Sequence, residues 1–452
     1  MNGRPLSWIG IVRLGLVQTA LGAIVVLTTS TMNRVMVVEL ALPASLPGLL
    51  VGLHYAIQLL RPRLGYGSDV GGRPVRWIVG GMGVLAIGGV TASLAIGWMV
   101  TSTFAGIALA VCAFVLIGLG VGAAGTTLLV LLAKQVGEER RAAAASITWI
   151  MMIVGFIVTA GVAGHYLDPF SPSRLVAVTA AVALLALLVT VAATWNIDAE
   201  APTRDRAFEP TNTAISGRVA FWQALQQVWA EPAARRFTVF VFVSMLAYSL
   251  QDLILEPFAG LVFGFSPGES TQLAGVQHSG VLIGMLLAAA AGSLARGRGW
   301  GSLRAWTIGG CISSALALMG LAMAALVGEP WPLRATVFAL GAANGAFAAA
   351  AIGSMMALAG KGRSQREGTR MGLWGASQAI AFGAGGILGA VAIDVARALI
   401  RETGVAYATV FGAEAGLFLI AAAIAMRLDR GTARNYSSTE RGRHVLAGAD
   451  HV

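Results

Sequence analysis

The sequence contains very little charge for its length. Only 12% of its 452 residues are Asp, Glu, Lys or Arg, whereas 57% are hydrophobic. A soluble protein of this size needs a far more charged surface, so most of this surface must face lipid. The short alternating strands of a membrane β-barrel are also missing. The composition therefore predicts a polytopic, all-α membrane protein.

Cysteine and the usual signs of catalysis are scarce as well. Cys112 and Cys311 each stand alone in a predicted helix, which argues against a disulfide and against a thiolate metal site. No nucleophile–base pair, phosphate-binding loop or metal-ligand cluster is present, so we expect no enzymatic activity and no catalytic residues. The first apolar segment lacks a small-residue cleavage site, and we expect it to stay in the membrane.

Apolar stretches of membrane-spanning length recur throughout the chain, about twelve of them at roughly 20 residues per span. They cover residues 11–36, 46–62, 75–96, 103–132, 142–165, 173–195, 237–262, 271–295, 303–327, 332–359, 370–393 and 404–427. The one long polar break lies between the sixth and the seventh. We therefore expect a six-helix bundle over 1–195, a cytoplasmic linker over 196–236, a second six-helix bundle over 237–427 and a disordered cytoplasmic tail over 428–452.

Within the linker, apolar side chains follow one face of a predicted helix over residues 216–229. They are Phe221, Trp222, Leu225, Val228 and Trp229. Such a stripe fits a helix that lies on the cytoplasmic membrane surface. Docking of a partner protein on the same stripe is the alternative.

Basic residues gather on one side of the predicted topology. Most of the 31 Lys and Arg residues fall in the loops on the amino-terminal side and in the two tails. This bias predicts that both termini of the multi-pass protein are cytoplasmic. The net charge of +10 is then explained by anionic membrane lipids, without nucleic acid as a partner.

The chain repeats itself with an offset of 225 residues. Gly67-Ser68 recurs as Gly292-Ser293, Gly72-Arg73 as Gly297-Arg298, and Trp149 as Trp374. A parallel duplication of six helices is typical of the major facilitator architecture, in which two pseudo-symmetric bundles hold a substrate between them.

The loop after the second helix has the spacing Gly-x-x-x-Asp-x-x-Gly-Arg. Its members are Gly65, Asp69, Gly72 and Arg73. The pattern is that of the major facilitator superfamily, where such a loop acts as a conformational latch. The second half carries Leu294 where the first carries Asp69, so a plain turn stabilised by a salt bridge stays open as an alternative.

Ionisable residues flank the ends of two apolar segments, where each is expensive and usually functional. Arg34 and Glu39 flank the outer end of the first helix, Asp252 and Glu256 flank that of the seventh, and the polar Gln251 precedes Asp252. One interpretation is an Arg34–Asp252 or Arg34–Glu256 bridge between the halves. The others are recognition of carbonyl or carboxyl groups of a ligand, and proton coupling through a lone carboxylate.

Three segments together resemble a known family: Asn33–Glu39, the loop Gly65–Arg73, and Gln251–Pro257. They are similar to the bacteriochlorophyll delivery family, the PucC/LhaA-type branch of the major facilitator superfamily in phototrophic bacteria. The loop Arg61–Arg73 looks most like the paralogue found among bacteriochlorophyll biosynthesis genes, sometimes labelled a bacteriochlorophyll synthase chain. That label implies catalysis, but the Asp-rich magnesium-diphosphate motifs of a prenyl-transferring synthase are missing.

The resemblance implies that the chain binds bacteriochlorophyll or a late precursor as cargo, in a photosynthetic membrane. It would hand the pigment to light-harvesting or reaction-centre subunits, with bacteriochlorophyll synthase as a further candidate partner and no catalytic cofactor. Two alternatives remain: a secondary transporter that moves a small solute by alternating access, and an assembly scaffold that never touches pigment.

Histidine is the natural axial ligand for the magnesium of such a pigment. His54 lies in the second predicted helix and His278 at nearly the same place in the eighth. We expect both to be pigment ligands, His54 first, or else hydrogen-bonded packing residues. His165 ends the fifth helix, and His444 and His451 lie in the tail. No carboxylate lies within helical reach of His54 or His278, so a metal site made by the protein alone is not expected.

Overall fold

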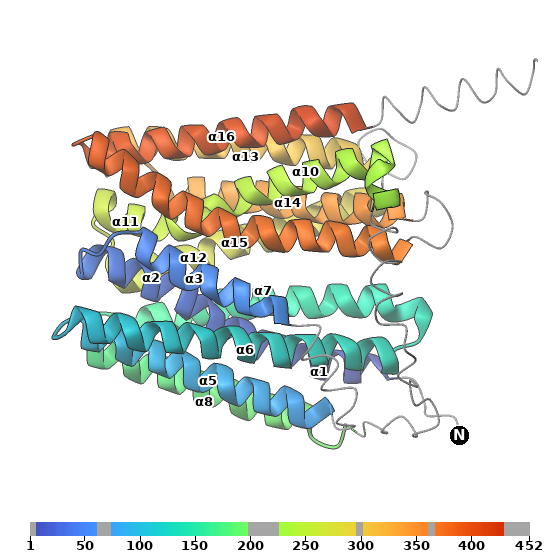
Figure 1. Ribbon diagram of the computed structural model, residues 1–452, viewed down its shortest axis with the longest axis horizontal. Helices are drawn as coiled ribbons and strands as arrows, with labels where there is room; N and C mark the ends of the chain where they lie inside the picture. Colours follow the sequence, from blue (N-terminus) through green and yellow to red (C-terminus); the bar gives the residue numbers. More distant parts are fainter. Residues whose placement is uncertain (1–5, 61–73, 198–225, 295–301, 360–366, 429–452) are drawn as a thin grey trace, which may run out of the picture.

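The computed structural model describes residues 6–60, 74–197, 226–294, 302–359 and 367–428. All regular structure in these ranges is helical (Figure 1). Among the described residues, eleven helices are long and apolar enough to cross a membrane, and a shorter apolar helix covers Ser45–Leu60. That shorter helix stands where the sequence predicts a span over 46–62.

The first half contains six spans. They are α1 (Trp8–Val26) continued through α2 (Met32–Arg34), α3 (Ser45–Ile57), α5 (Pro74–Met99), α6 (Thr103–Gln135), α7 (Arg141–Leu167) and α8 (Pro172–Thr194). The second half contains α10 (Pro232–Leu250) continued by α11 (Leu255–Phe263), then α12 (Pro267–Leu294), α13 (Leu303–Val327), α14 (Leu333–Ala359), α15 (Glu367–Leu399) and α16 (Thr403–Leu428). Each half therefore repeats the same order of elements.

Local signals explain several helix starts. Ser7, Ser171 and Ser302 each accept a hydrogen bond from a backbone N–H three residues later, at 3.2, 3.2 and 3.1 Å. An N-cap hydroxyl of this kind satisfies one of the free donors of the first helical turn. Proline stands at the first helical position of α8, where its missing N–H costs nothing because that donor has no partner within the helix.

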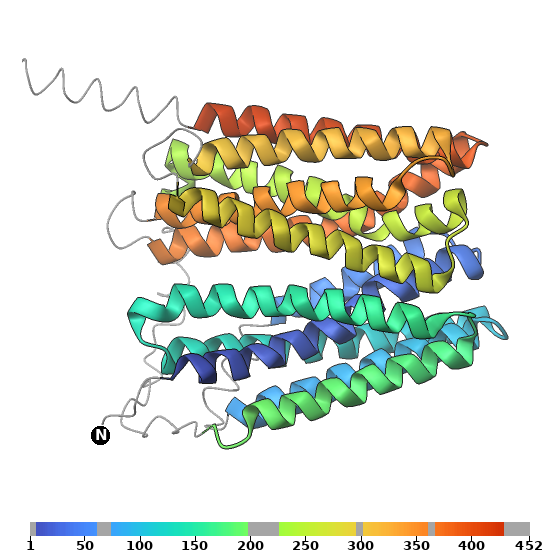
Figure 2. The same cartoon turned by 180° about the vertical axis from the view of Figure 1, so that it is seen from behind.

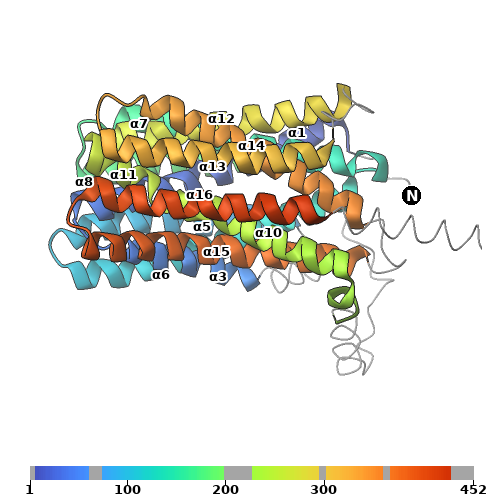
Figure 3. The same ribbon diagram turned by 90° about the horizontal axis from the view of Figure 1, so that it is seen from above.

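Each half has its own hydrophobic core. One cluster of buried side chains draws mainly on α1, α3, α5, α6 and α8, and the other mainly on α10 through α16. Figures 1 and 2 show the halves as two stacked bundles, with α2, α3, α11 and α12 lying between them. The view from above in Figure 3 shows the helices of both halves running nearly parallel.

The halves meet along two seams. In one seam α3 packs against α15, and in the other α7 packs against α12. We call the end of the molecule where α1 begins and α16 ends the linker side, and the opposite end the far side. The far side carries the turns between α2 and α3, between α7 and α8, and between α11 and α12.

Several expected features lie outside the described residues. These are the loop with Gly65, Asp69, Gly72 and Arg73, most of the linker over 196–236, and His444 and His451 in the tail. Of the apolar stripe in the linker only Val228, which is buried, and Trp229, which is exposed, belong to the described part.

Candidate functional site

The first helix of each half is interrupted at the same level. In the first half, α1 passes into a π-helical turn at Leu27–Thr31, where Thr28 and Thr29 both donate to the Val25 carbonyl at 2.8 and 3.0 Å. In the second half, α10 passes into a 3₁₀ turn at Gln251–Leu253. The repeat offset of 225 places residue 27 on residue 252, so the two interruptions are equivalent. Such turns are frequent at functional sites.

Polar side chains from the interrupted helices join the halves. Ser30 Oγ donates to Glu256 Oε1, and Asn33 Nδ2 donates to the Leu253 carbonyl at 2.7 Å. The hydroxyls of Thr31 and Thr271 are 2.8 Å apart. These groups are buried, so each hydrogen bond also satisfies a side chain that would be costly to leave unpaired.

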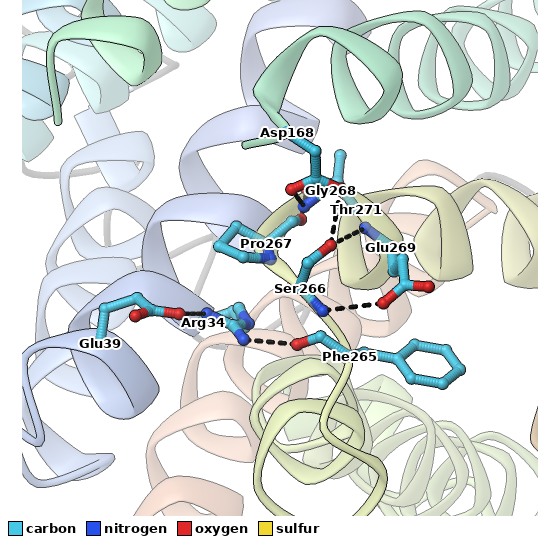
Figure 4. A network of polar contacts seen from close by, with 9 residues as sticks. All are labelled: Arg34, Glu39, Asp168, Phe265, Ser266, Pro267, Gly268, Glu269 and Thr271. Carbon is cyan, nitrogen blue, oxygen red and sulfur yellow. Dashed lines mark hydrogen bonds and ion pairs between the residues drawn. The ribbon is translucent and has the colours of Figure 1, made fainter. Parts of the chain in front are cut away.

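Arg34 is only 2% exposed and binds on both sides of the interface. Its guanidinium forms an ion pair with Glu39 and donates from Nη2 to the Phe265 carbonyl at 2.6 Å (Figure 4). A Cβ added to Gly260 would come within 3.0 Å of Nη2, so a glycine there leaves room for the guanidinium. Arg34 is therefore a cross-half contact through a backbone carbonyl.

The expected Arg34–Asp252 or Arg34–Glu256 bridge is absent from the described residues. The reason lies in the backbone of the first helix. Residues Val35–Glu39 form a second π-helical turn, which brings positions five apart into line and so places Glu39 beside Arg34. Glu256 accepts a hydrogen bond from Ser30 instead.

A further carboxyl group, which no sequence motif marks, lies near this region. Glu414 of α16 is buried. It follows Tyr407 and Phe411 on one helical face, and both of these rings pack against Phe258 of α11. Within the described part of the chain, neither Glu414 oxygen has a hydrogen-bond partner.

Asp252 lies within electrostatic range of both Glu256 and Glu414. Asp252 is exposed, whereas its neighbour Gln251 is fully buried. The carboxyl group of Asp252, in the 3₁₀ turn after α10, is therefore within electrostatic range of one carboxyl group of α11 and one of α16.

The two candidate histidines lie at the two seams and differ in their ring contacts. His54 is 3% exposed, and its Nε2 lies 2.8 Å from Gln58 Nε2 of the same helix. In His278, Nδ1 lies 2.8 Å from the Ala274 carbonyl, so this nitrogen carries the proton. The lone pair of the neutral ring is then on Nε2, which is the arrangement of a metal-ligating histidine. The geometry thus favours His278 over His54 as a ligand.

The ring of His278 also touches the other half. It packs edge-on against Phe156 of α7, with ring centroids 4.7 Å apart. His54 belongs to the other seam, where Tyr55 packs near Phe382 of α15 at 6.5 Å. His165 is exposed at the end of α7. Among the residues with described side chains, no set of three His, Cys, Asp or Glu is placed to hold a metal ion.

The start of α12 on the far side is a second polar network (Figure 4). Ser266 Oγ accepts from the Glu269 N–H at 3.1 Å, and Glu269 Oε2 accepts from the Ser266 N–H at 2.9 Å. This reciprocal pair is a capping box, which the spacing Ser-x-x-Glu signals in the sequence. Asp168 joins the network from the other half, since it accepts from Ser266 Oγ at 2.6 Å.

Known proteins resemble this chain over nearly its full length. A family model described as PUCC protein matches residues 31–433. A bacteriochlorophyll synthase 44.5 kDa chain from Rhodobacter capsulatus is 52% identical over 432 residues, which cover 95% of this chain and 98% of that one. Protein PucC from Rhodobacter capsulatus is 30% identical over 444 residues, which cover 94% and 92%.

Solved structures share the arrangement of helices at low sequence identity. A structure concerned with substrate recognition in proton dependent oligopeptide transporters has a TM-score of 0.69 and 16% identity, covering 93% of this chain and 97% of that one. A bacterial homologue of the human lysosomal transporter Spinster, in an inward-facing and unoccupied conformation, has a TM-score of 0.67 and 17% identity, covering 93% and 96%. These matches confirm the major facilitator fold that the internal repeat predicts.

Proposed function

Because the chain belongs to the PUCC protein family, we propose that it binds bacteriochlorophyll, or a late precursor, within the membrane and delivers it to light-harvesting or reaction-centre polypeptides. The name of one relative, a bacteriochlorophyll synthase chain, supports bacteriochlorophyll as the class of cargo. The membrane is then a photosynthetic inner membrane, with both termini on its cytoplasmic face.

The observation that carries the proposal is the ring of His278 at the seam between α7 and α12. Its Nδ1 proton is held by the Ala274 carbonyl, which leaves the Nε2 lone pair for the magnesium of a tetrapyrrole. Phe156 from the opposite half packs against the same ring. A pigment bound there would touch both halves, so a change in their relative position would alter its binding.

We further propose that the chain carries pigment and makes or breaks no bond in it. A carrier of this kind needs an apolar seam for the ring system and the tail, one axial ligand and a few polar groups. Arg34, Asp252 and Glu256 supply such polar groups on the interrupted helices. The guanidinium of Arg34 can donate to carbonyl and carboxyl groups at the rim of a tetrapyrrole, whereas Asp252 and Glu256 can do so only in their protonated form.

A second candidate function is secondary transport of a small solute. The observation that favours it is that the buried carboxyl group of Glu414 lies within electrostatic range of Asp252, so that coupling would not depend on a single carboxylate. Buried acids in membrane proteins often belong to ion or proton pathways. This candidate predicts uptake of a solute into vesicles without bound pigment.

The test is purification of the chain from a phototrophic membrane in mild detergent, followed by an absorption spectrum and a transfer assay. In the assay, the loaded protein is mixed with vesicles that contain pigment-free light-harvesting polypeptides. We expect a bacteriochlorophyll band with the protein, and its shift to the antenna position on mixing. A folded protein without pigment would reject the carrier, and bound pigment that never transfers would reject the delivery step.

A further inference from the structure

Two aspartates on the far side bind across the two seams. Asp168 follows directly on α7, which ends at Leu167. Its Oδ2 accepts from Ser266 Oγ at 2.6 Å and its Oδ1 from the Gly268 N–H at 3.2 Å (Figure 4). Pro267 has no N–H, so Gly268 offers the first backbone donor of α12. A residue of the first half thereby caps a helix of the second.

At the other seam, a carboxylate of the second half caps a helix of the first half. Asp394 lies in the last part of α15, in the second half. Its Oδ1 accepts from the Ala44 N–H at 2.8 Å and its Oδ2 from the Ser45 N–H at 2.7 Å. These two amides open α3, in the first half.

The internal repeat relates the two contacts. Adding the offset of 225 to residue 168 gives 393, one position before Asp394. The same offset carries α7 onto α15 and α3 onto α12. Each half therefore sends a carboxylate from the end of its fifth span to the start of the second span of the other half. The first amides of a helix lack internal partners and carry partial positive charge, so a carboxylate is a strong acceptor for them.

We propose that Asp168 and Asp394 form a pair of far-side clasps that hold the two halves closed there, and that both must release before the chain can open on that side. The term far-side clasp means one of these carboxylates with its two donors.

The packing beside each clasp supports this role. A Cβ added to Gly164 would meet the Gly268 carbonyl at 2.7 Å, and one added to Gly48 would meet Ala390 at 2.7 Å. The halves are therefore in direct contact where the carboxylates bind. Arg174 donates to the Asp168 carbonyl at 2.6 Å and so holds that residue at the seam.

The chemistry of the clasps suits a reversible contact. When the halves separate, the carboxylates and the amides are free to bind water, so neither partner is left as a buried charge. In a carrier with two conformations, such a pair would hold the far side closed in one of them. The inference holds for a pigment and for a small solute alike, so its failure would leave the proposed function untouched.

The experiment measures the distance across the far side by double electron–electron resonance in nanodiscs. Spin labels are attached to cysteines at Thr101 and Glu329, exposed turn residues of opposite halves, in a chain with Cys112→Ser and Cys311→Ala. For Asp168→Asn combined with Asp394→Asn, we expect a longer-distance population at least twice that of the unchanged chain. Each single substitution should give an intermediate increase.

Two controls separate release from unfolding. A label pair within the first half, at Thr101 and Ser173, should keep its distance in every variant. Glu402→Gln removes a far-side carboxyl that makes no cross-half contact among the described residues, and it should change nothing. An unaltered far-side distance in the double variant would overturn the proposal. If the double variant does not fold, unaltered distances in both single variants would overturn it equally.

Discussion

At the scale of single residues, the stability of the interface depends on whether each buried charged group has a hydrogen-bond or ion-pair partner. Arg34 is almost fully buried and depends on Glu39 and on the Phe265 carbonyl. Glu414 is equally buried, yet neither of its oxygens has a hydrogen-bond partner among the described residues. Removing the charge should therefore lower the stability of the protein at Glu39 but not at Glu414.

We predict that Glu39→Gln destabilises the protein by about 1–3 kcal/mol, because it weakens a charged hydrogen bond to a buried guanidinium. The measurement is thermal unfolding followed by tryptophan fluorescence, to which 11 Trp residues contribute. Glu402→Gln is the matched control, since that acid is exposed and opens α16. A melting temperature of Glu39→Gln equal to that of the unchanged protein would show that the Arg34–Glu39 pair adds nothing to stability.

Glu414→Gln should leave the melting temperature unchanged or raise it. The substitution keeps the shape of the side chain but removes a buried ionisable group that has no hydrogen-bond partner in the described part of the chain. The same unfolding measurement applies. A clear loss of stability would mean that the carboxyl group has a structural partner, and loss of solute uptake at full stability would favour the transport candidate.

The sequence predicts the importance of some of these residues but not of others. Arg34, Glu39 and Glu256 stand out because charge is rare in apolar segments, and all three lie at the interface. The partner of Arg34 was not predictable, because the π-helical turn that brings Glu39 beside it depends on the folded backbone. Asp168 and Asp394 look like ordinary acids near helix ends, and only tertiary structure reveals their partners.

At the scale of elements, the length of an apolar stretch predicts the bounds of a helix well, but the sequence does not predict where a helix is interrupted. The predicted span over 303–327 coincides with α13, and that over 404–427 differs from α16 by one residue at each end. The interruptions at Leu27–Thr31 and Gln251–Leu253 had no periodic signal, because the apolar pattern continues through them. The capping box at the start of α12 was readable locally, but its contact with Asp168 was not.

Ser266→Ala should destabilise the protein more than Ser302→Ala does. Both serines are N-caps, and losing such a cap costs about 0.5–2 kcal/mol. Ser266 also donates to Asp168 across the seam, whereas Ser302 caps α13 alone. Unfolding curves of the two variants make the comparison. A smaller effect at Ser266 would show that the cross-half hydrogen bond contributes little.

At the scale of the whole molecule, the internal repeat explains most of the architecture. The offset of 225 carries the first span Trp8–Glu39 onto 233–264, and the seventh span is Pro232–Phe263. The two halves, the paired interruptions and the paired far-side clasps all follow this relation. The repeat was visible in the sequence as matching glycine, arginine and tryptophan positions.

The orientation in the membrane is testable with single cysteines. Basic residues on the linker side predict that this side is cytoplasmic. In a chain with Cys112→Ser and Cys311→Ala, a cysteine at exposed Ser173 on the far side should react with an impermeant maleimide in intact spheroplasts. A cysteine at exposed Ser302 on the linker side should react only after the membrane is opened. The reverse pattern would contradict the predicted topology.

The measurement that tests the central proposal most directly is the amount of bacteriochlorophyll bound per folded chain in the unchanged protein, His278→Phe and His54→Phe. All three are purified from the same phototrophic host and compared by absorption. Because the Ala274 carbonyl holds the Nδ1 proton of His278, whereas Nε2 of His54 contacts Gln58, we predict that His278→Phe loses most of its pigment and that His54→Phe keeps it. Full pigment binding by His278→Phe would contradict the ligand assignment, and pigment-free unchanged protein would contradict the carrier itself.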